Sequence, residues 1–199
     1  MRVGIIRTGT SNEASVIFAL ERLGVEWKLI TLPSEMLEVQ RFILPGVGSA
    51  SKAMASLQAT GLDHAIQNLD KPLLGICLGM QILYEYSEED EYPCLGILPG
   101  KIEKISSQDG LRTPHMGWNK LQFKVATNPL FRGLSEAEYM YFVHSYCHSP
   151  DENTIATCEY GSVFTAMTNR EHFFGCQFHP ERSSVAGSKI IENFLEVKC

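Results

Sequence analysis

The sequence has no long apolar run and no excess of positive charge. No stretch approaches the roughly 20 apolar residues that a membrane-spanning helix needs. Acidic residues outnumber basic ones by 23 to 17, which gives a formal net charge of −6. This balance argues against nucleic acid or an anionic membrane as the main partner. The apolar segment at the amino terminus is too short for a signal peptide, so we expect a cytoplasmic protein.

The six cysteines lie far apart along the chain, and none of them belongs to a Cys-x-x-Cys pair. Zinc sites are normally built from cysteines and histidines at short, regular spacings, so a zinc site is not expected. In a reducing compartment, isolated cysteines remain free thiols. We therefore expect no metal and no other cofactor, and each cysteine is open to consideration as a nucleophile.

Short apolar segments alternate with helical patterns in the first half of the chain. Strands are expected at residues 3–6, 27–30, 41–44 and 73–76, and helices at 11–23, 49–57 and 80–86. This alternation predicts a parallel sheet with helices on both faces. More strands are expected later, at 120–125, 139–143, 154–159, 163–167 and 173–178, before a helix at 188–197. We predict one α/β domain over residues 1–199, of the doubly wound type, which binds ligands at the carboxyl ends of its strands.

The segment Gly75-x-Cys77-x-Gly79 follows an apolar run and has the spacing of a nucleophile elbow. The glycines let neighbouring backbone pass close to the turn, and the turn projects the thiol clear of the sheet. The amino terminus of the next helix favours a thiolate, and the Leu78 N–H would point at a developing oxyanion. The pentapeptide alone fits a buried structural cysteine equally well.

A second apolar strand ends in His179-Pro180-Glu181. Pro180 biases His179 toward extended geometry, in which residues i and i+2 project to the same side. The carboxylate of Glu181 could then orient the imidazole of His179 and leave its other nitrogen free as a base. A strand-end histidine beside a solvated glutamate is the alternative, and the cysteine elbow in the same sheet favours the catalytic interpretation.

Three further segments concentrate glycine or polar side chains. The turn at 45–49 is rich in glycine, and its N–H groups could complete an oxyanion hole. A phosphate cradle competes with this idea, but the turn lacks both Gly-x-Gly-x-x-Gly and a Walker lysine. Residues 114–119 are expected to form a loop and residues 141–146 the end of a strand. The acidic run at 85–91 is expected to be a solvated face or loop.

Together these motifs resemble the class I, triad-type glutamine amidotransferases over essentially the whole chain. In that family a Gly-x-Cys-x-Gly elbow works with a distant His-Pro-Glu. The likeness also includes the more specific stretch His-Met-Gly-Trp-Asn at 115–119. The resemblance implies a single three-layer domain, with a mixed, mostly parallel central sheet flanked by helices and a strand-rich second half.

The resemblance also implies a chemistry. Cys77 would attack the side-chain amide of L-glutamine and form a thioester. His179, held by Glu181, would move the proton to the departing ammonia and then activate water. The implied oxyanion donors are the backbone of Val47 or Gly48 and that of Leu78. The residues implied to line the glutamine site are Gln81, His144, Ser145 and Tyr146.

The ammonia would then pass to a separate partner, because the glutaminase motifs occupy the whole chain. The resemblance implies a (β/α)₈-barrel cyclase subunit of histidine biosynthesis, in a heterodimer. The candidates for the interface are Asn12, Met116, Trp118 and Arg182. Arg7 and Arg182 depart from the common family pattern near the expected docking region. Service to a paralogous synthase, a stand-alone cysteine hydrolase and an inactive scaffold are the alternatives, although the intact triad argues against the last.

Overall fold

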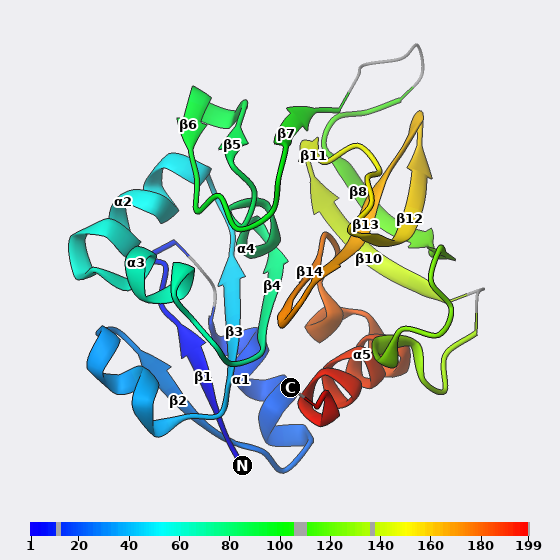
Figure 1. The fold of residues 1–199 in the computed structure, drawn as a ribbon. Helices are drawn as coiled ribbons and strands as arrows, with labels where there is room; N and C mark the ends of the chain where they lie inside the picture. The colour runs from blue at the N-terminus through cyan, green and yellow to red at the C-terminus, as the bar shows by residue number, and fades with distance from the viewer. Residues whose placement is uncertain (11–12, 106–110, 136–137, 199) are drawn as a thin grey trace.

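The computed structural model describes residues 1–10, 13–105, 111–135 and 138–198, and its centre is an eight-stranded mixed sheet (Figure 1). The strand order is β2 (Glu26–Ile30), β1 (Arg2–Ile6), β3 (Arg41–Gly46), β4 (Leu73–Cys77), β14 (Phe173–Cys176), β13 (Ser162–Arg170), β12 (Thr154–Tyr160) and β9 (Gln122–Phe123). The five strands from β2 to β14 are parallel, whereas β13, β12 and β9 pair antiparallel. The predicted mixed sheet is confirmed.

Helices cover both faces of this sheet because its central strands bury side chains on both sides. The helices are α1 (Glu13–Arg22), α2 (Ala50–Thr60), α3 (Leu62–Gln67), α4 (Leu78–Gln81) and α5 (Ser184–Glu196). Ile43 and Leu74 belong to a core cluster with side chains of α1 and α5. Their sequence neighbours Phe42 and Leu73 belong to a second cluster with α2 and α3. Among the described residues, no helix is long and apolar enough to cross a membrane.

Of two smaller sheets, one lies beside β12 and β13, and the other stands beyond the ends toward which β3 and β4 point (Figure 1). One is an antiparallel pair of β8 (His115–Lys120) and β10 (Tyr139–His144). The other has the order β11 (Tyr146–Cys147), β7 (Lys101–Lys104), β5 (Tyr86–Ser87) and β6 (Tyr92–Pro93). Four short 3₁₀ helices complete the described elements, namely η1 (Pro33–Glu38), η2 (Glu89–Glu91), η3 (Pro129–Phe131) and η4 (Pro180–Arg182). The ends of the parallel strands are therefore bordered by short strands from both halves of the sequence.

Three of the predicted elements differ from the structure. The expected loop at 114–119 is mostly strand β8, which pairs along its whole length with β10. The expected helix at 80–86 is the four-residue α4, and β5 already begins at Tyr86. The expected strand at 120–125 is split between the end of β8 and β9. In each case a pairing with a distant segment overrides the local pattern.

Three glycines allow the turn after β4 to lie against the backbone of β3. A Cβ atom on Gly79 would lie 1.7 Å from the carbonyl oxygen of Leu44. A Cβ atom on Gly75 would lie 2.6 Å from the Gly79 carbonyl oxygen, and one on Gly46 would lie 2.8 Å from the Gly79 nitrogen. No side chain fits at these distances, so this backbone contact fixes the height of Cys77 above the sheet.

We predict that Gly79→Ala lowers the free energy of unfolding by about 3 kcal/mol or more, because the new methyl group overlaps backbone that cannot move aside. The matched control is Gly24→Ala, where nothing lies within 4 Å of an added Cβ and only the φ of +68° opposes the side chain. Its expected cost is about 1 kcal/mol. Urea unfolding of the two variants compares these values, and equal stabilities would contradict the close backbone contact.

Candidate active site

Cys77 lies between β4 and α4 with φ of 54° and ψ of −112°, a strained conformation for a residue with a side chain. Its thiol donates to the Val143 carbonyl oxygen at 3.7 Å, and Gln177 Nε2 donates to the sulfur at 3.8 Å. Cys77 is 7% exposed and lines a pocket, so the sulfur is not sealed in the apolar core. This is the geometry expected of a nucleophile elbow.

Hydrogen bonds to the ring and to the backbone of His179 hold its imidazole in place. Its Nδ1 lies 2.8 Å from Glu181 Oε1, to which it donates. The His179 N–H donates to the Tyr141 carbonyl oxygen at 2.9 Å, and Ser183 Oγ donates to the His179 carbonyl oxygen at 2.7 Å. His179 has the predicted extended geometry, but Glu181 reaches it because η4 turns the chain. The carboxylate therefore fixes the tautomer that leaves Nε2 available.

Opposing effects set the charge of His179. Burial by itself lowers the pKa of His179, but hydrogen bonds with Cys77 and Glu181, together with the charges of both groups, raise it to about 10. The protonated ring of His179 is in hydrogen-bond contact with Cys77. The four-residue α4 is too short to supply a large dipole, so His179 is the main positive group at the thiol.

The predicted oxyanion and glutamine-binding residues line one pocket of about 270 Å³ together with Cys77 and His179. These pocket residues are Val47, Gly48, Leu78, Gln81, His144, Ser145 and Tyr146. Glu181 lies in an adjoining pocket, which shares Val47 and His179 with the first. Among the described residues, no group of three or more His, Cys, Asp or Glu side chains is placed to hold a metal ion. The pocket has the size and polarity to admit a small amide.

A pair of buried amides adjoins the nucleophile. Gln81 Nε2 donates to the Tyr146 carbonyl oxygen at 2.9 Å and to Gln177 Oε1 at 3.0 Å. Both N–H bonds of Gln81 are thus used, and its Oε1 is left to accept from a substrate. Gln177 is fully buried and donates to Cys77, yet no sequence motif assigned it a role. The only feature of the sequence that could have pointed to Gln177 was its position two residues before His179.

The acidic run at 85–91 is mostly exposed, as predicted, and Glu89 is the exception among its acidic residues. Its side chain is half-buried in the wall of the pocket that contains Cys77, and its Oε2 accepts from the Ala50 N–H at 3.3 Å. Burial, above all, raises the pKa of Glu89. A carboxylate in this wall offers a partner for the ammonium group of an amino acid. The run contains several acidic residues, and nothing in the sequence distinguishes Glu89 from the others.

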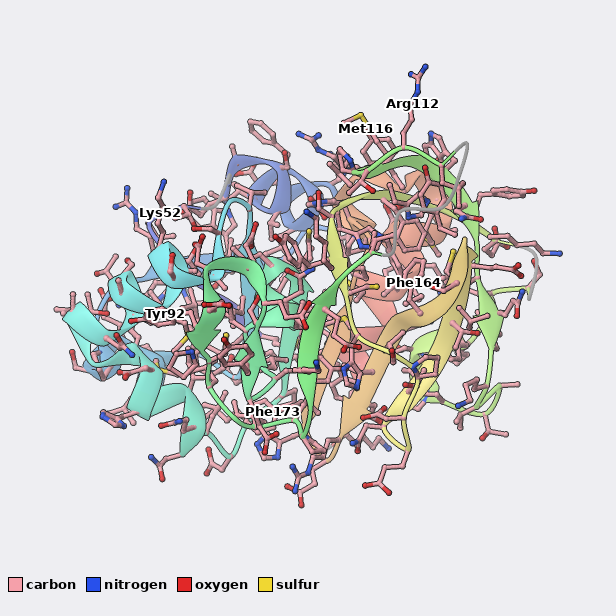
Figure 2. All side chains as sticks on the ribbon, turned by 90° about the horizontal axis from the view of Figure 1, so that it is seen from above. Lys52, Tyr92, Arg112, Met116, Phe164 and Phe173 are labelled. Atoms are coloured by element: carbon pink, nitrogen blue, oxygen red, sulfur yellow. The ribbon has the colours of Figure 1, made fainter. Side chains whose placement is uncertain are left out.

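The predicted interface residues do not all fall within the described chain. Met116 and Trp118 are exposed on the outward side of β8, and Figure 2 shows Met116 at the periphery of the molecule. Arg182 is exposed and lines the pocket that adjoins the glutamine pocket. Asn12 lies outside the described residues. Three of the four candidates are therefore available at the surface.

The glutamine amidotransferase class-I family model matches residues 5–197. This chain belongs to that family. Within it, the chain is similar to proteins named imidazole glycerol phosphate synthase subunit HisH. It is 46% identical to the one from Colwellia psychrerythraea, across 97% of this chain and 92% of the relative. It is 48% identical to HisH 1 of Vibrio vulnificus across 98% of both chains.

Solved structures agree with the fold. One described as glutamine amidotransferase has a TM-score of 0.75 at 20% identity and covers 98% of this chain and 97% of its own. The glutaminase domain of Trypanosoma brucei CTPS has a TM-score of 0.66 at 12% identity, across 100% of this chain and 95% of its own. At these identities the likeness concerns the fold alone, and it supports the predicted α/β architecture.

We predict that iodoacetamide alkylates Cys77 before the other described cysteines near neutral pH, because burial raises the pKa of Cys94, Cys147, Cys158 and Cys176. Glu181→Gln removes one group that keeps His179 protonated, so alkylation of Cys77 should slow by about tenfold near neutral pH. The two rates should converge toward alkaline pH, where thiols ionise without help.

Peptide mass spectrometry measures the rate at Cys77. The control is Glu196→Gln, which changes an exposed carboxylate on α5 and should leave the rate unchanged. Equal rates in the parent and Glu181→Gln proteins would show that the carboxylate does not act on the thiol through His179.

Proposed function

We propose that this chain is the glutaminase subunit of an imidazole glycerol phosphate synthase. It hydrolyses L-glutamine to glutamate and ammonia, and it delivers the ammonia to a separate subunit. The observation that carries the proposal is the convergence of Cys77 and His179 at one pocket, with Glu181 hydrogen-bonded to His179 behind it. Identity of 46–48% to HisH proteins over nearly the whole chain supports the particular synthase.

The first half of the reaction forms a thioester. The thiolate of Cys77 attacks the side-chain carbonyl carbon of glutamine, and the carbonyl oxygen becomes an oxyanion. His179 gives its proton to the amide nitrogen, the C–N bond breaks, and ammonia leaves. In the second half, His179 takes a proton from water as the water attacks the thioester. Glutamate departs and Cys77 regains its starting state, with Glu181 holding the imidazole throughout.

The oxyanion is stabilised by backbone N–H groups from two turns. One donor is the N–H of Leu78, directly after the nucleophile, and the other belongs to Val47 or Gly48. Gly48 has φ of +87°, and a Cβ there would meet only Thr10, at 3.8 Å. Val47 is 40% exposed. Because little packs against this turn, docking of a partner can complete the alignment of its N–H groups.

The ends of the substrate are recognised by different groups. Glu89 pairs with the α-ammonium of glutamine, and Gln81 Oε1 accepts a hydrogen bond from the substrate. Ser145 and Tyr146 contribute the wall opposite the turn that contains Gly48. A substrate without the ammonium group leaves the carboxylate of Glu89 unpaired, which favours free glutamine over peptides.

The partner is a (β/α)₈-barrel cyclase, which uses the ammonia to make imidazole glycerol phosphate and an aminoimidazole carboxamide ribotide for histidine biosynthesis in the cytoplasm. It docks on the outward side of β8 and β10, where Met116 lies opposite Val143 and Trp118 lies opposite Tyr141. The Val143 carbonyl oxygen accepts from the Cys77 thiol at 3.7 Å. The docking surface therefore adjoins the nucleophile, and the exposed Arg182 lies at its border.

We predict that the isolated chain hydrolyses glutamine very slowly and that the cyclase subunit with its ligand accelerates the reaction. Cys77→Ala should reduce glutamate formation in the complex by on the order of 10⁴-fold, because no nucleophile remains. Coupled assay of glutamate measures both effects. Full turnover without a partner would favour a stand-alone hydrolase, and acceleration by a paralogous synthase alone would identify a different acceptor.

We predict that Trp118→Ala weakens binding of the cyclase subunit by roughly 30-fold, as expected when an aromatic anchor is removed from an interface. Isothermal titration calorimetry measures the affinity. The control is Val185→Ala, which removes an exposed apolar side chain on α5. Unchanged affinity of the Trp118 variant would exclude this face of β8 from the interface.

A further inference from the structure

Two buried histidines are hydrogen-bonded to each other behind the glutamine pocket. His115 on β8 lies opposite His144 on β10, and His115 Nδ1 is 2.9 Å from His144 Nε2. The ring of His115 stacks with Phe142 and Tyr160, at centroid distances of 5.0 and 4.1 Å. His144 lines the pocket, whereas His115 does not. His115 therefore acts on the pocket only through another residue.

The backbone fixes the direction of this hydrogen bond. His144 Nδ1 is 2.9 Å from the carbonyl oxygen of Tyr146, which can only accept. His144 therefore carries its proton on Nδ1, and its Nε2 accepts. His115 must then carry a proton on Nδ1 and donate it to His144. Each ring has one permitted tautomer.

On the other side of His115, the hydrogen bonds of Asn119 also permit only one direction of donation. Asn119 Nδ2 lies 3.3 Å from His115 Nε2 and donates to the Glu159 carbonyl oxygen at 2.9 Å. Asn119 Oδ1 accepts from the Lys120 N–H at 2.8 Å. The amide cannot rotate by half a turn without placing like groups against both backbone partners. Asn119 therefore remains a donor to His115.

Burial keeps both rings neutral. It lowers the pKa of His144 to about 3 and that of His115 to about 4. The value for His144 already includes the hydrogen bond to Tyr146, which raises its pKa, and the nearby His115 and His179, which lower it. A second proton on His144 would face the Nδ1–H of His115, so the neutral state and the hydrogen-bond direction support each other.

The same Tyr146 carbonyl oxygen also accepts from Gln81 Nε2 at 2.9 Å. Gln81 in turn donates to Gln177 Oε1, and Gln177 Nε2 donates to Cys77 Sγ. Donors from His144 and Gln81 converge on the Tyr146 carbonyl oxygen, and from Gln81 onward each amide donates toward Cys77, so that an N–H of Gln177 is directed at the sulfur. A shift of the Tyr146 carbonyl would free Gln81 and, through it, the amide that faces the nucleophile.

We propose that His115 is a positioning residue for glutamine hydrolysis, which holds the Tyr146 carbonyl in place through His144 and so keeps the Gln81 and Gln177 amides directed at Cys77. The inference rests on the proposed glutaminase function and gives that site a positioning residue on the strand that carries the docking surface. Met116, the next residue along β8, faces outward, so the partner and this hydrogen-bonded series share one strand.

Two substitutions at His115 separate positioning from packing. His115→Phe keeps an aromatic ring between Phe142 and Tyr160 but removes the donor to His144. His115→Asn loses the ring stacking but places an amide donor near the position of Nδ1. If His115 positions the site, kcat/KM for glutamine in the complex with the cyclase falls roughly tenfold in the Phe variant and is largely restored in the Asn variant. A purely structural role gives the reverse order.

The control is His172→Phe, which removes a histidine that contacts the ring of Phe173 and is hydrogen-bonded to the Leu69 carbonyl oxygen at the opposite end of the sheet. Its kcat/KM should match the parent value. Parent kcat/KM in His115→Phe would overturn the inference. Failure of the parent complex to hydrolyse glutamine would instead overturn the proposed function, so the two failures are distinguishable.

A spectroscopic measurement on the parent protein keeps the inference testable if His115→Phe does not fold. Long-range ¹H–¹⁵N correlation spectra report which imidazole nitrogen carries the proton. At about neutral pH, both His115 and His144 should be neutral Nδ1–H tautomers. An Nε2–H tautomer or an imidazolium at His144 would overturn the inference.

Discussion

The site depends on the pairing of two parallel strands, β4 and β14, that come from opposite halves of the chain. Cys176 lies opposite Ile76 in this pairing. The next residue of each strand reaches the same end of the sheet, and the Gln177 amide bonds to the Cys77 sulfur there. His179 follows two residues later. A register shift by one residue would move these side chains to other faces and separate the thiol from the imidazole.

Backbone contacts then hold the sulfur in place. The turn after β4 lies against β3 because Gly46, Gly75 and Gly79 have no side chains, and Cys77 adopts a positive φ in this turn. Apolar clusters on both faces of the sheet stabilise β3 and β4, so the strain at one residue is opposed by extensive packing. The nucleophile is consequently presented by the most deeply buried strands of the domain, while the substrate walls come from the smaller sheets.

Part of this arrangement could be predicted from the sequence, for identifiable reasons. The strands at 41–44 and 73–76 lie near the middle of the sheet, and burial on both faces gives them continuous apolar runs. The extended geometry of His179 followed from the effect of Pro180 on its neighbour, whereas the turn of η4 that brings Glu181 to the imidazole was not foreseen. By contrast, β8 was expected to be a loop, because its glycine and polar residues are typical of turns and its partner β10 is distant in sequence. Glu89, Gln177 and His115 could not be selected because their roles arise from tertiary contacts.

The central claim is that the imidazole of His179 is protonated beside the sulfur of Cys77, at the end of the sheet where β4 and β14 meet. The most direct test is the protonation state of His179, followed by ¹⁵N chemical shifts of its imidazole in the parent protein and in Cys77→Ala. The account predicts an imidazolium at about pH 8 in the parent, because Cys77 and Glu181 raise its pKa, and loss of that proton at lower pH in the variant. A neutral imidazole in the parent at this pH, or identical titrations of the two proteins, would contradict it.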